Sequence, residues 1–265
     1  MSLHYKKVIY PTLDPGQNLP TFRASDLQIV EAIAPTVSVV LFEQQKFAYK
    51  KIDRPIYEPS DTDHILDEIE ALAKFQGQSN IAQLVGLVIS ENHYKTNSSS
   101  DTPEVITGFL LEYYSGGSLE EISVETKIRN GSLLIQWALQ IGSALESMHE
   151  SGRTHLDIKP SNILLDARGN AILIDISGTG GYDWEWLSPE MQGLLQRNGE
   201  LAPVSAPWKA RIDTDQWAYG RLLATIAEKS GDRDARVKLQ SIAGDLMRTA
   251  PEARISLCDA LAKLQ

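Results

Sequence analysis

Residues 155–166 read HLDIKPSNILLD, and Asp175 follows in the same part of the chain. Transfer of a phosphoryl group needs a carboxylate that orients the attacking hydroxyl, a cation that meets the developing charge, and oxygen ligands for magnesium. Side chains of these three kinds are present as Asp157, Lys159 and Asn162, with Asp175. The alternative is a polar turn between two strands. Because the polar residues fall in register before an apolar Ile-Leu-Leu run, the stretch predicts a phosphoryl-transfer loop.

The composition is typical of a folded, soluble protein. The chain has 265 residues, enough to bury a substantial core, of which 42% are hydrophobic and 23% are charged. No apolar run reaches the roughly twenty residues that a membrane span needs. With 35 acidic against 25 basic residues, the net charge of -10 disfavours binding to nucleic acid or to anionic membranes. We therefore expect one catalytic unit without a nucleic-acid or membrane partner.

The cysteine count and the first residues indicate an intracellular location. Cys258 is the single cysteine, so the chain cannot form an internal disulfide. Residues 1–7 lack the apolar stretch of a secretory signal. We therefore expect an intracellular protein in the cytoplasm, with the nucleus as the alternative.

The first half of the chain is patterned mainly as strands. Residues 1–27 are rich in proline with little periodicity, which predicts an N-terminal extension that lies over the surface or is partly mobile. Strand-like segments follow at 36–42, 46–52, 81–89 and 105–114. The first two are predicted to form a hairpin. Apolar residues within 61–75 repeat at spacings of three and four, which predicts an amphipathic helix. Residues 91–103 are polar and predict a loop.

The second half is patterned mainly as helices. One apolar face of a long helix leading to His155 is marked by Leu134, Ala138, Ile141, Leu145 and Met148. The chain from Asp213 onward is also helical in pattern. The change from strands to helices near Gly116-Gly117 predicts a hinge between two lobes, at which a nucleotide would bind.

The pattern of the catalytic stretch resembles that of protein kinases, which reads H-R-D-x-x-x-x-N and is followed by D-F-G. The resemblance implies an α+β fold with two lobes, a small β-rich lobe with one main helix and a larger, mainly helical lobe. It also implies ATP and Mg²⁺ as cofactors, with Asp157 as the catalytic base. Asn162 and Asp175 would be the magnesium ligands, and Lys159 would neutralise the γ-phosphate as charge moves.

Ala48-Tyr49-Lys50 matches the A-x-K of the third kinase strand. The resemblance implies that a glutamate of the following helix holds Lys50 against the α- and β-phosphates. Glu68 keeps the family's spacing to the apolar residues of that helix, whereas Glu70 would point roughly 160° away at 100° per residue. We therefore expect an inward pair of Lys50 and Glu68. Lys51 is the alternative lysine, but its side chain should face the opposite side of the strand.

Residues 109–119 read FLLEYYSGGSL and are similar to the kinase hinge, an apolar strand that ends in a Gly-Gly step before a helix. The resemblance implies that backbone groups of Glu112 to Tyr114 bind the adenine, with Leu111 at its back wall. Ser118 would reach the ribose. The full set of nucleotide contacts that it implies is Ala48, Lys50, Leu111, Glu112, Tyr113, Tyr114, Ser118, Leu164 and Asp175.

Three further elements resemble parts of the kinase scaffold. Ser188-Pro189-Glu190 resembles the A-P-E that closes the activation segment, and residues 215–220, DQWAYG, resemble the D-x-W-x-x-G helix of the large lobe. The resemblance implies a buried ion pair between Glu190 and Arg254, which supports the scaffold and takes no part in the chemistry. The parts of the chain that it implies are an N-terminal extension at 1–27, a small lobe at 28–114 and a large lobe at 115–265.

The chain departs from the kinase pattern at several positions. Residues 31–38, where the glycine-rich loop should lie, contain no glycine, so their backbone should grip phosphates less well. Leu156 replaces the arginine that would hold a phosphorylated activation loop, so we expect no switching by phosphorylation there. D-F-G has become Asp175-Ile176-Ser177. The segment from Asp175 to Glu190 is short. Less chain than usual lies between Gly220 and Arg254, which predicts a reduced docking surface for protein substrates.

Three functions fit this set of residues. The first is an ATP-dependent phosphotransferase of the protein kinase type, acting on serine or threonine of an unidentified protein substrate, because every charged role has a residue. The second is a pseudokinase that binds partners or nucleotide without catalysis, which the missing glycines and Ser177 favour. The third is a small-molecule kinase, which would explain the reduced docking surface.

Overall fold

A computed structural model describes residues 8–13, 18–53, 57–91, 104–125, 128–179 and 181–265, the side chains of 123–125 excepted. Residues 1–7 and most of the predicted loop at 91–103 lie outside the described residues. The chain divides into two compact units. Unit 1 consists of Met1–Gly77 and Ala82–Tyr113, and unit 2 of Gln78–Ile81 and Tyr114–Gln265.

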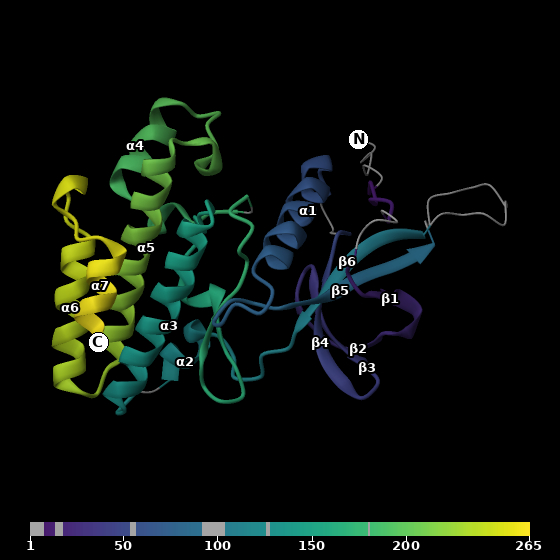
Figure 1. Cartoon of the computed structure of the whole chain (residues 1–265), viewed down its shortest axis with the longest axis horizontal. Coiled ribbons are helices and arrows are strands. Elements are labelled where there is room, and N and C mark those ends of the chain that lie inside the picture. Colours follow the sequence, from purple (N-terminus) through teal and green to yellow (C-terminus); the bar gives the residue numbers. More distant parts are fainter. Residues whose placement is uncertain (1–7, 14–17, 54–56, 92–103, 126–127, 180) are drawn as a thin grey trace, which may run out of the picture. The chain divides into compact units, whose positions relative to one another are not determined.

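Unit 1 contains a six-stranded sheet and one long helix (Figure 1). Its strands are β1 (Thr21–Arg23), β2 (Gln28–Ala34), β3 (Val37–Phe42), β4 (Gln45–Lys51), β5 (Leu84–Glu91) and β6 (Glu104–Glu112). They lie in the order β1-β5-β6-β4-β3-β2, with β1 parallel to β5 and the other neighbours antiparallel. The predicted hairpin is confirmed as β3 and β4. β1 lies within residues 1–27, so part of the predicted extension is built into the sheet.

Side chains of β4 alternate between the two faces of the sheet, as the geometry of a strand requires. The buried cluster on one face consists of Val40, Phe47, Tyr49, Val88 and Leu110. Because successive side chains of a strand point to opposite faces, Ala48 and Lys50 lie on the other face. The strand therefore separates Lys50 from this hydrophobic cluster.

The helix of unit 1, α1 (Pro59–Lys74), begins at a proline, whose missing N–H is not needed in the first turn. Glu58 and Asp61 form a capping box, in which the backbone N–H of Glu58 donates to Oδ2 of Asp61 at 2.7 Å. The buried residues of the helix are Asp61, Thr62, Ile65, Glu68, Ile69, Ala71 and Leu72. Their spacing confirms the predicted amphipathic helix, and beyond the first turn Glu68 is the charged residue in the buried stripe.

Unit 2 is mainly helical (Figure 1). Its helices are α2 (Leu119–Glu125), α3 (Gly131–Glu150), α4 (Pro189–Arg197), α5 (Trp208–Lys229), α6 (Arg233–Leu246) and α7 (Leu257–Leu264). Two short strands, β7 (Ile163–Leu165) and β8 (Ala171–Leu173), form a separate ribbon. The predicted long helix is confirmed as α3, in which the side chains of the expected apolar face are all fully buried.

Two glycines allow the helices of unit 2 to pack closely. A Cβ at Gly142 of α3 would lie 2.7 Å from the hydroxyl of Tyr219 on α5, and a Cβ at Gly220 of α5 would lie 2.9 Å from Cβ of Leu246 on α6. Side chains do not approach so closely, so these helices can meet only where one residue has no Cβ. α5 and α6 are joined directly by Ser230–Asp232, which leaves no helix between them.

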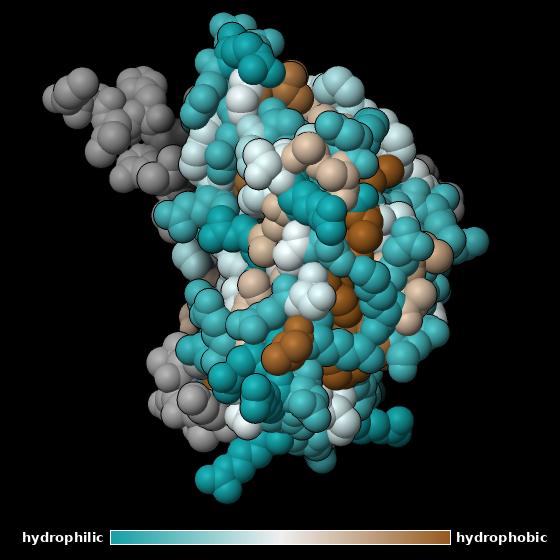
Figure 2. Space-filling view, turned by 90° about the vertical axis from the view of Figure 1, so that its left-hand side faces the viewer, coloured by the Kyte–Doolittle hydropathy of each residue, from teal (hydrophilic) through white to brown (hydrophobic). Residues whose placement is uncertain are grey.

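The side of the molecule on which α6 and α7 lie is mostly hydrophilic (Figure 2). Hydrophobic residues show there as separate spots, and scattered exposed hydrophobic side chains are normal on protein surfaces. On α6, Val237 is 58% exposed. None of the helices that the structure describes combines the length and the apolarity needed to cross a bilayer.

Candidate active site

The ribbon of unit 2 brings Asn162 and Asp175 to the same end. β7 and β8 are antiparallel, with Ile163 opposite Leu173. Asn162 precedes β7 and Ile174 follows β8, and the backbone N–H of Ile174 donates to the carbonyl oxygen of Asn162 at 3.1 Å. Asp175 is the next residue. Backbone register therefore places the two predicted metal ligands near each other.

The turn that carries Asp157 is held by a buried carboxylate. Asp215 on α5 is 0% exposed, and it accepts hydrogen bonds from the backbone N–H groups of His155 at 2.8 Å and Leu156 at 2.7 Å. Its Oδ2 also lies 2.9 Å from Nε2 of His149, in the last turn of α3. Leu156 has a φ of 64°, which is costly for a residue with a side chain. Such a conformation persists where the surroundings enforce it, and Asp215 bonds to this backbone directly.

The ring of His155 connects this turn to the residue before Asp175. Nε2 donates to the carbonyl oxygen of Ile174 at 2.9 Å, since a carbonyl can only accept. Nδ1 accepts from the backbone N–H of Asp157 at 3.2 Å. Both ring nitrogens are used, and the ring carries its proton on Nε2. His155 is therefore a buried link between the turn and Asp175, and not an exposed acid or base.

Asp157, Lys159 and Asn162 form one network of polar contacts. Nζ of Lys159 lies 2.9 Å from Oδ1 and 2.8 Å from Oδ2 of Asp157. Nδ2 of Asn162 donates to Oδ2 of Asp157 at 2.8 Å and to its carbonyl oxygen at 2.7 Å. The carboxylate is thereby held in one orientation while its side chain stays 15% exposed. Because Asn162 uses its amide nitrogen in both contacts, its amide oxygen is the atom that could bind a metal ion.

Asp175 is an exposed residue in the left-handed region, with a φ of 56°. The next residue, Ile176, is 0% exposed, so its apolar side chain is fully buried next to the exposed carboxylate. The other positive φ in this stretch falls on Gly178, and a Cβ there would lie 2.5 Å from the carbonyl oxygen of Thr154. Ser177 occupies the position of the D-F-G glycine. The glycine that adopts a positive φ is Gly178, the next residue.

Unit 1 contains a second charged pair, between β4 and α1. Nζ of Lys50 lies 2.8 Å from Oε1 and 2.7 Å from Oε2 of Glu68, and the two side chains are 18% and 6% exposed. Glu70 is exposed. Nζ of Lys51 lies 5.5 Å from the centre of the Tyr49 ring, on the opposite face of the strand from Lys50. The predicted pair is confirmed, while its contact with phosphates stays a prediction.

The predicted adenine contacts lie at the end of β6. Leu111 is the register partner of Ala48 across β6 and β4, so these two side chains are adjacent on one face of the sheet. The backbone N–H of Glu112 donates to the carbonyl oxygen of Gln83 at 3.1 Å. The N–H of Glu112 is therefore engaged within the sheet, and the contact of an adenine with the backbone of residues 112–114 stays a prediction.

Ser118 begins a helix. Its backbone N–H donates to Oε2 of Glu121 at 2.9 Å, and its hydroxyl accepts from the N–H of Glu121 at 3.2 Å, which is a capping box on α2. Ser118 also forms an antiparallel bridge with Leu164 of β7. The structure thus brings these two predicted nucleotide contacts together. The hydroxyl of Ser118 is engaged in capping, and its contact with a ribose stays a prediction.

Comparison with known proteins decides the family. The protein kinase domain model matches residues 36–179, which is more than half of the chain. The chain belongs to the protein kinase family. The matched part contains both charged pairs described above, that of Lys50 with Glu68 and that of Lys159 with Asp157.

Similar kinases come from animals and yeast. Serine/threonine-protein kinase LATS2 of Homo sapiens is 28% identical over 157 residues, which cover 57% of this chain and 14% of that protein. Serine/threonine-protein kinase Warts of Drosophila melanogaster is 29% identical over 147 residues, covering 54% and 12%. Serine/threonine-protein kinase CBK1 of Saccharomyces cerevisiae is 24% identical over 155 residues, covering 54% and 20%. The chain thus spans about a fifth or less of the length of these curated relatives.

In this member of the protein kinase family, a buried leucine stands where the family pattern has the arginine of the catalytic loop. Leu156 is 6% exposed. The hydrophobic cluster to which it belongs consists of Leu156, Leu187, Met191, Leu195 and Ala206. Leu187 directly precedes Ser188-Pro189-Glu190, and Met191 and Leu195 lie on α4. The catalytic loop is therefore joined to the end of the activation segment by apolar packing, which needs no phosphate.

Arg221 on α5 adds a polar contact to the same segment. Its guanidinium lies 5.1 Å from the centre of the Trp186 ring, within the range of a cation–π interaction. The same group donates to the carbonyl oxygen of Glu185. The sequence reasoning missed Arg221 because no motif marks it. It also missed His149, whose signal was its place in the last turn of the helix that leads to His155.

Replacing Leu156 by alanine is expected to lower the free energy of unfolding by about 2–5 kcal/mol, the range for deleting a buried leucine side chain. The cost arises because the hydrophobic cluster around Leu156 would be left with a cavity. Urea denaturation of both proteins measures it. Val237→Ala, at an exposed position, is the control and should change stability by less than about 0.5 kcal/mol. Equal effects of the two substitutions would contradict the burial of Leu156.

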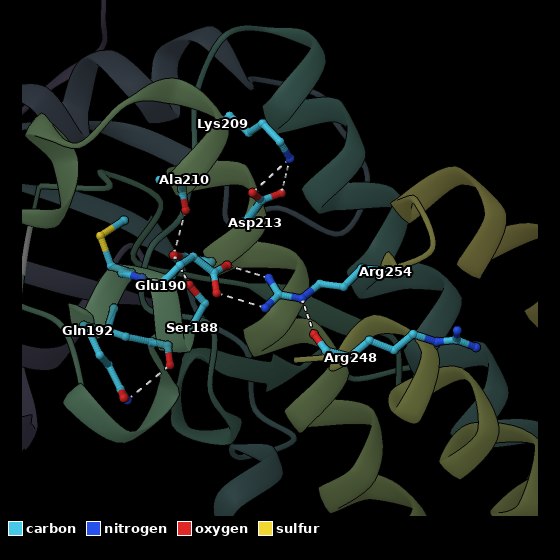
Figure 3. A network of polar contacts seen from close by, with 11 residues as sticks. Ser188, Glu190, Gln192, Lys209, Ala210, Asp213, Arg248 and Arg254 are labelled. Atoms are coloured by element: carbon cyan, nitrogen blue, oxygen red, sulfur yellow. Dashed lines mark hydrogen bonds and ion pairs between the residues drawn. The ribbon is translucent and has the colours of Figure 1, made fainter. Parts of the chain in front are cut away.

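Glu190 of the A-P-E motif and Arg254 form a bidentate ion pair (Figure 3). The distances are 2.5 Å from Nη1 to Oε1 and 2.9 Å from Nη2 to Oε2, and the side chain of Arg254 is 1% exposed. Burial by itself would raise the pKa of Glu190. The hydrogen bond and charge of Arg254, together with hydrogen bonds from the backbone and from Ser188, outweigh burial, so that the pKa lies below its usual value. The predicted ion pair is confirmed.

Unit 2 also has an open cavity of about 470 Å³ at the start of α5. Its walls include Trp208, Ile212, Gln216, Pro251, Arg254 and Ile255. None of the residues that line it is a predicted catalytic, nucleotide-binding or metal-binding residue. The cavity therefore lies apart from the candidate active site.

Proposed function

We propose that this kinase transfers the γ-phosphate of Mg-ATP to serine or threonine side chains of a protein. The observation that carries the proposal is the state of Asp157, whose carboxylate is held by Lys159 and Asn162 and yet remains partly exposed. A carboxylate held in this way can accept a hydrogen bond from a substrate hydroxyl and orient its oxygen for attack. The serine/threonine kinases among the relatives support this class of substrate.

Each charged side chain of the site has a separate role in the reaction. As the γ-phosphoryl group moves from ADP to the hydroxyl oxygen, the hydroxyl proton passes to the carboxylate of Asp157. Nζ of Lys159, 2.8 Å from that carboxylate, offsets the negative charge on the transferred group. Lys50 orients ATP through its α- and β-phosphates. Glu68 restrains Lys50, because moving the ammonium away would leave a buried carboxylate without its partner.

The oxygen atoms of Asn162 and Asp175 fit a magnesium ion. Mg²⁺ prefers hard oxygen ligands and is commonly bound by one or two carboxylates together with substrate phosphates. Among the described residues no three His, Cys, Asp or Glu side chains are grouped to hold a metal ion, so phosphates and water would supply the remaining ligands. When bound, magnesium would offset the charge of the phosphates.

ATP with magnesium is expected to raise the melting temperature of the wild-type protein and to have little effect on Asp175→Ala. At a concentration ten times the dissociation constant, binding stabilises a protein by about 1.4 kcal/mol, which corresponds to a shift of about 3–6 °C for a chain of this size. Thermal unfolding with and without magnesium measures the shift. Glu200→Ala, which removes an exposed carboxylate of the same unit, is the control. An equal shift in Asp175→Ala would contradict the assigned metal site.

Transfer itself is tested with γ-labelled ATP, magnesium and a generic protein substrate. Label recovered as phosphoserine or phosphothreonine supports the proposal. No labelled product at millimolar ATP contradicts it, provided that the wild-type protein remains folded in the assay.

A pseudokinase is the second candidate, and the turn between β2 and β3 favours it. Pro35 and Thr36 join these strands in the place of the glycine-rich loop, and proline has no N–H to offer a phosphate. In that case ATP would yield no labelled product, and it would stabilise the fold only if the pseudokinase binds nucleotide. A small-molecule kinase is favoured by the direct connection of α5 to α6, which reduces the surface for a protein substrate. Label transfer only to a metabolite would identify that third function.

A further inference from the structure

Residues 8–12, which we call the strap, are bonded to the beginning of α1. The backbone N–H of Ile9 donates to the hydroxyl of Tyr57 at 3.0 Å, and the hydroxyl of Thr62 donates to the carbonyl oxygen of Ile9 at 2.7 Å. The two hydroxyls lie 2.9 Å apart. Tyr57 and Thr62 are both buried, at 7% and 6% exposure. Side chains at the start of the helix thus bond both the N–H and the carbonyl oxygen of Ile9.

Together with the backbone of Ile9, these three hydrogen bonds close a ring in which each donor points to the next acceptor in the same sense. Thr62 has one hydroxyl proton and gives it to the carbonyl of Ile9, so Tyr57 must be the donor between the two hydroxyls. Each hydroxyl then donates once and accepts once. Bonds in such a chain polarise and strengthen one another. Detaching the strap would leave both buried hydroxyls short of a partner, which is unfavourable.

The strap is also bonded to the sheet. The backbone N–H of Ile106 in β6 donates to the carbonyl oxygen of Pro11 at 2.8 Å, and Thr12 forms an antiparallel bridge with Val105. Val8, at the start of the strap, is 8% exposed. The strap therefore joins the beginning of β6 to the beginning of α1, and all of these contacts lie within unit 1.

The strap matters because α1 carries Glu68. Thr62 and Glu68 lie on the same helix, about 9 Å apart along its axis at 1.5 Å per residue. Over this length a helix moves as one body, so that a shift of the first turn also shifts Glu68. The contacts of Glu68 with Lys50, at 2.7 and 2.8 Å, leave little room for such a shift.

We propose that the strap sets the position of α1 and so keeps Glu68 paired with Lys50. Tyr57 and Thr62 are then positioning residues, which act on ATP only through that pair. The catalytic consequence rests on the proposed function, whereas the effect on the pair does not. The two can therefore be tested separately.

The chain contains a matched control for the ring. The hydroxyl of Thr107 on β6 contacts the hydroxyl of Tyr49 at 3.0 Å and donates to the carbonyl oxygen of Val88 at 3.3 Å. Thr107→Val therefore removes one contact with a tyrosine and one with a carbonyl, as Thr62→Val does. Both threonines are buried in unit 1, but the hydrogen bonds that hold the strap use the side chain of Thr62 and not that of Thr107.

The pairing is tested by acylation of lysine side chains in the full-length protein without nucleotide. An amine-acylating ester is used at limiting dose, and labelling of Lys50 is measured by mass spectrometry relative to exposed Lys46 on the same strand. Glu68→Gln defines the labelling of Lys50 in the absence of the Glu68 carboxylate. We expect Thr62→Val to raise the labelling of Lys50 about two- to tenfold, which corresponds to the net free energy of one hydrogen bond. Thr107→Val should leave it at the wild-type value.

Two results would overturn the proposal: labelling of Lys50 in Thr62→Val that equals the wild type, or an equal increase in Thr107→Val, which would indicate general loosening. If Thr62→Val does not fold, the labelling of Lys50 is compared between Tyr57→Phe and its control Tyr49→Phe. Each of these substitutions removes one hydroxyl and changes the packing less. In a kinase assay Thr62→Val should raise KM for ATP with a smaller effect on kcat. If the wild type transfers no phosphate, the proposed function fails, and the labelling still decides the role of the strap.

Discussion

Asp157→Asn is expected to lower kcat for phosphate transfer by about 10²–10⁴-fold, the range for removal of a general base. Asparagine has nearly the shape of aspartate and can still accept a hydrogen bond from Lys159, which donates to Oδ1 of Asp157 at 2.9 Å. It cannot take the proton of the attacking hydroxyl. Initial rates with γ-labelled ATP at saturating magnesium measure the loss, and the melting temperature should change little.

Asp166→Asn is the matched control for this prediction. Asp166 lies at the turn between β7 and β8, where it accepts from the backbone N–H groups of Arg168 and Asn170 at 2.8 Å each. An asparagine oxygen can keep both of these bonds, so the activity should stay near that of the wild type. Transfer that persists unchanged in Asp157→Asn would show that another group orients the hydroxyl.

Arg254→Ala is expected to lower the free energy of unfolding by about 3–5 kcal/mol, the cost of removing one partner from a buried ion pair. The side chain of Arg254 is 1% exposed and that of Glu190 is 24% exposed, so water can replace the lost guanidinium only in part. Urea denaturation near neutral pH measures the loss. The catalytic residues are not touched by this substitution, so any loss of activity should follow the loss of folded protein.

Arg248→Ala is the control for the ion pair. Arg248 forms a surface pair with Asp245, in which the side chain of the arginine is 55% exposed. Exposed pairs contribute about 0–1 kcal/mol, and the bond from Arg254 to the carbonyl oxygen of Arg248 does not depend on the side chain of Arg248. A cost of Arg254→Ala no larger than that of Arg248→Ala would contradict the structural role of the buried pair.

The contribution of the buried pair should also depend on pH. Because the pKa of Glu190 in the folded protein lies below its usual value, the stabilisation is complete above the unfolded pKa of about 4.3. It is lost as the pH falls through the lower, folded pKa. The difference in unfolding free energy between wild type and Arg254→Ala should therefore shrink as the pH is lowered below about 4.

The candidate site could largely be predicted from the sequence because its spacings are local. Asp157, Lys159 and Asn162 lie within one turn, where short-range backbone geometry brings them together. The helical period indicates that Glu68, and not Glu70, lies on the inward face of its helix. The alternation of side chains along a strand likewise indicates that Lys50 and Lys51 lie on opposite faces. These rules depend only on the geometry of a single element.

The strap and β1 had no such signal. Their bonds use the N–H and carbonyl groups of residues such as Ile9 and Pro11, which every chain position offers in some form. The burial of Leu156 was also hidden, because the sequence shows a lost arginine but not the hydrophobic cluster that receives the leucine. In the same way, nothing near Arg221 in the sequence names Trp186 as its partner.

The family of the fold, the side chains that carry the chemistry and the face of each element on which they lie can thus be predicted from the sequence. The buried partners that hold those side chains in place were found only in the folded chain: Asp215 for the catalytic turn, the hydrophobic cluster for Leu156, and the strap for α1. The physical reason is that period and spacing describe one element at a time. Contacts between distant elements depend on which surfaces meet, and no single stretch of the chain carries that information.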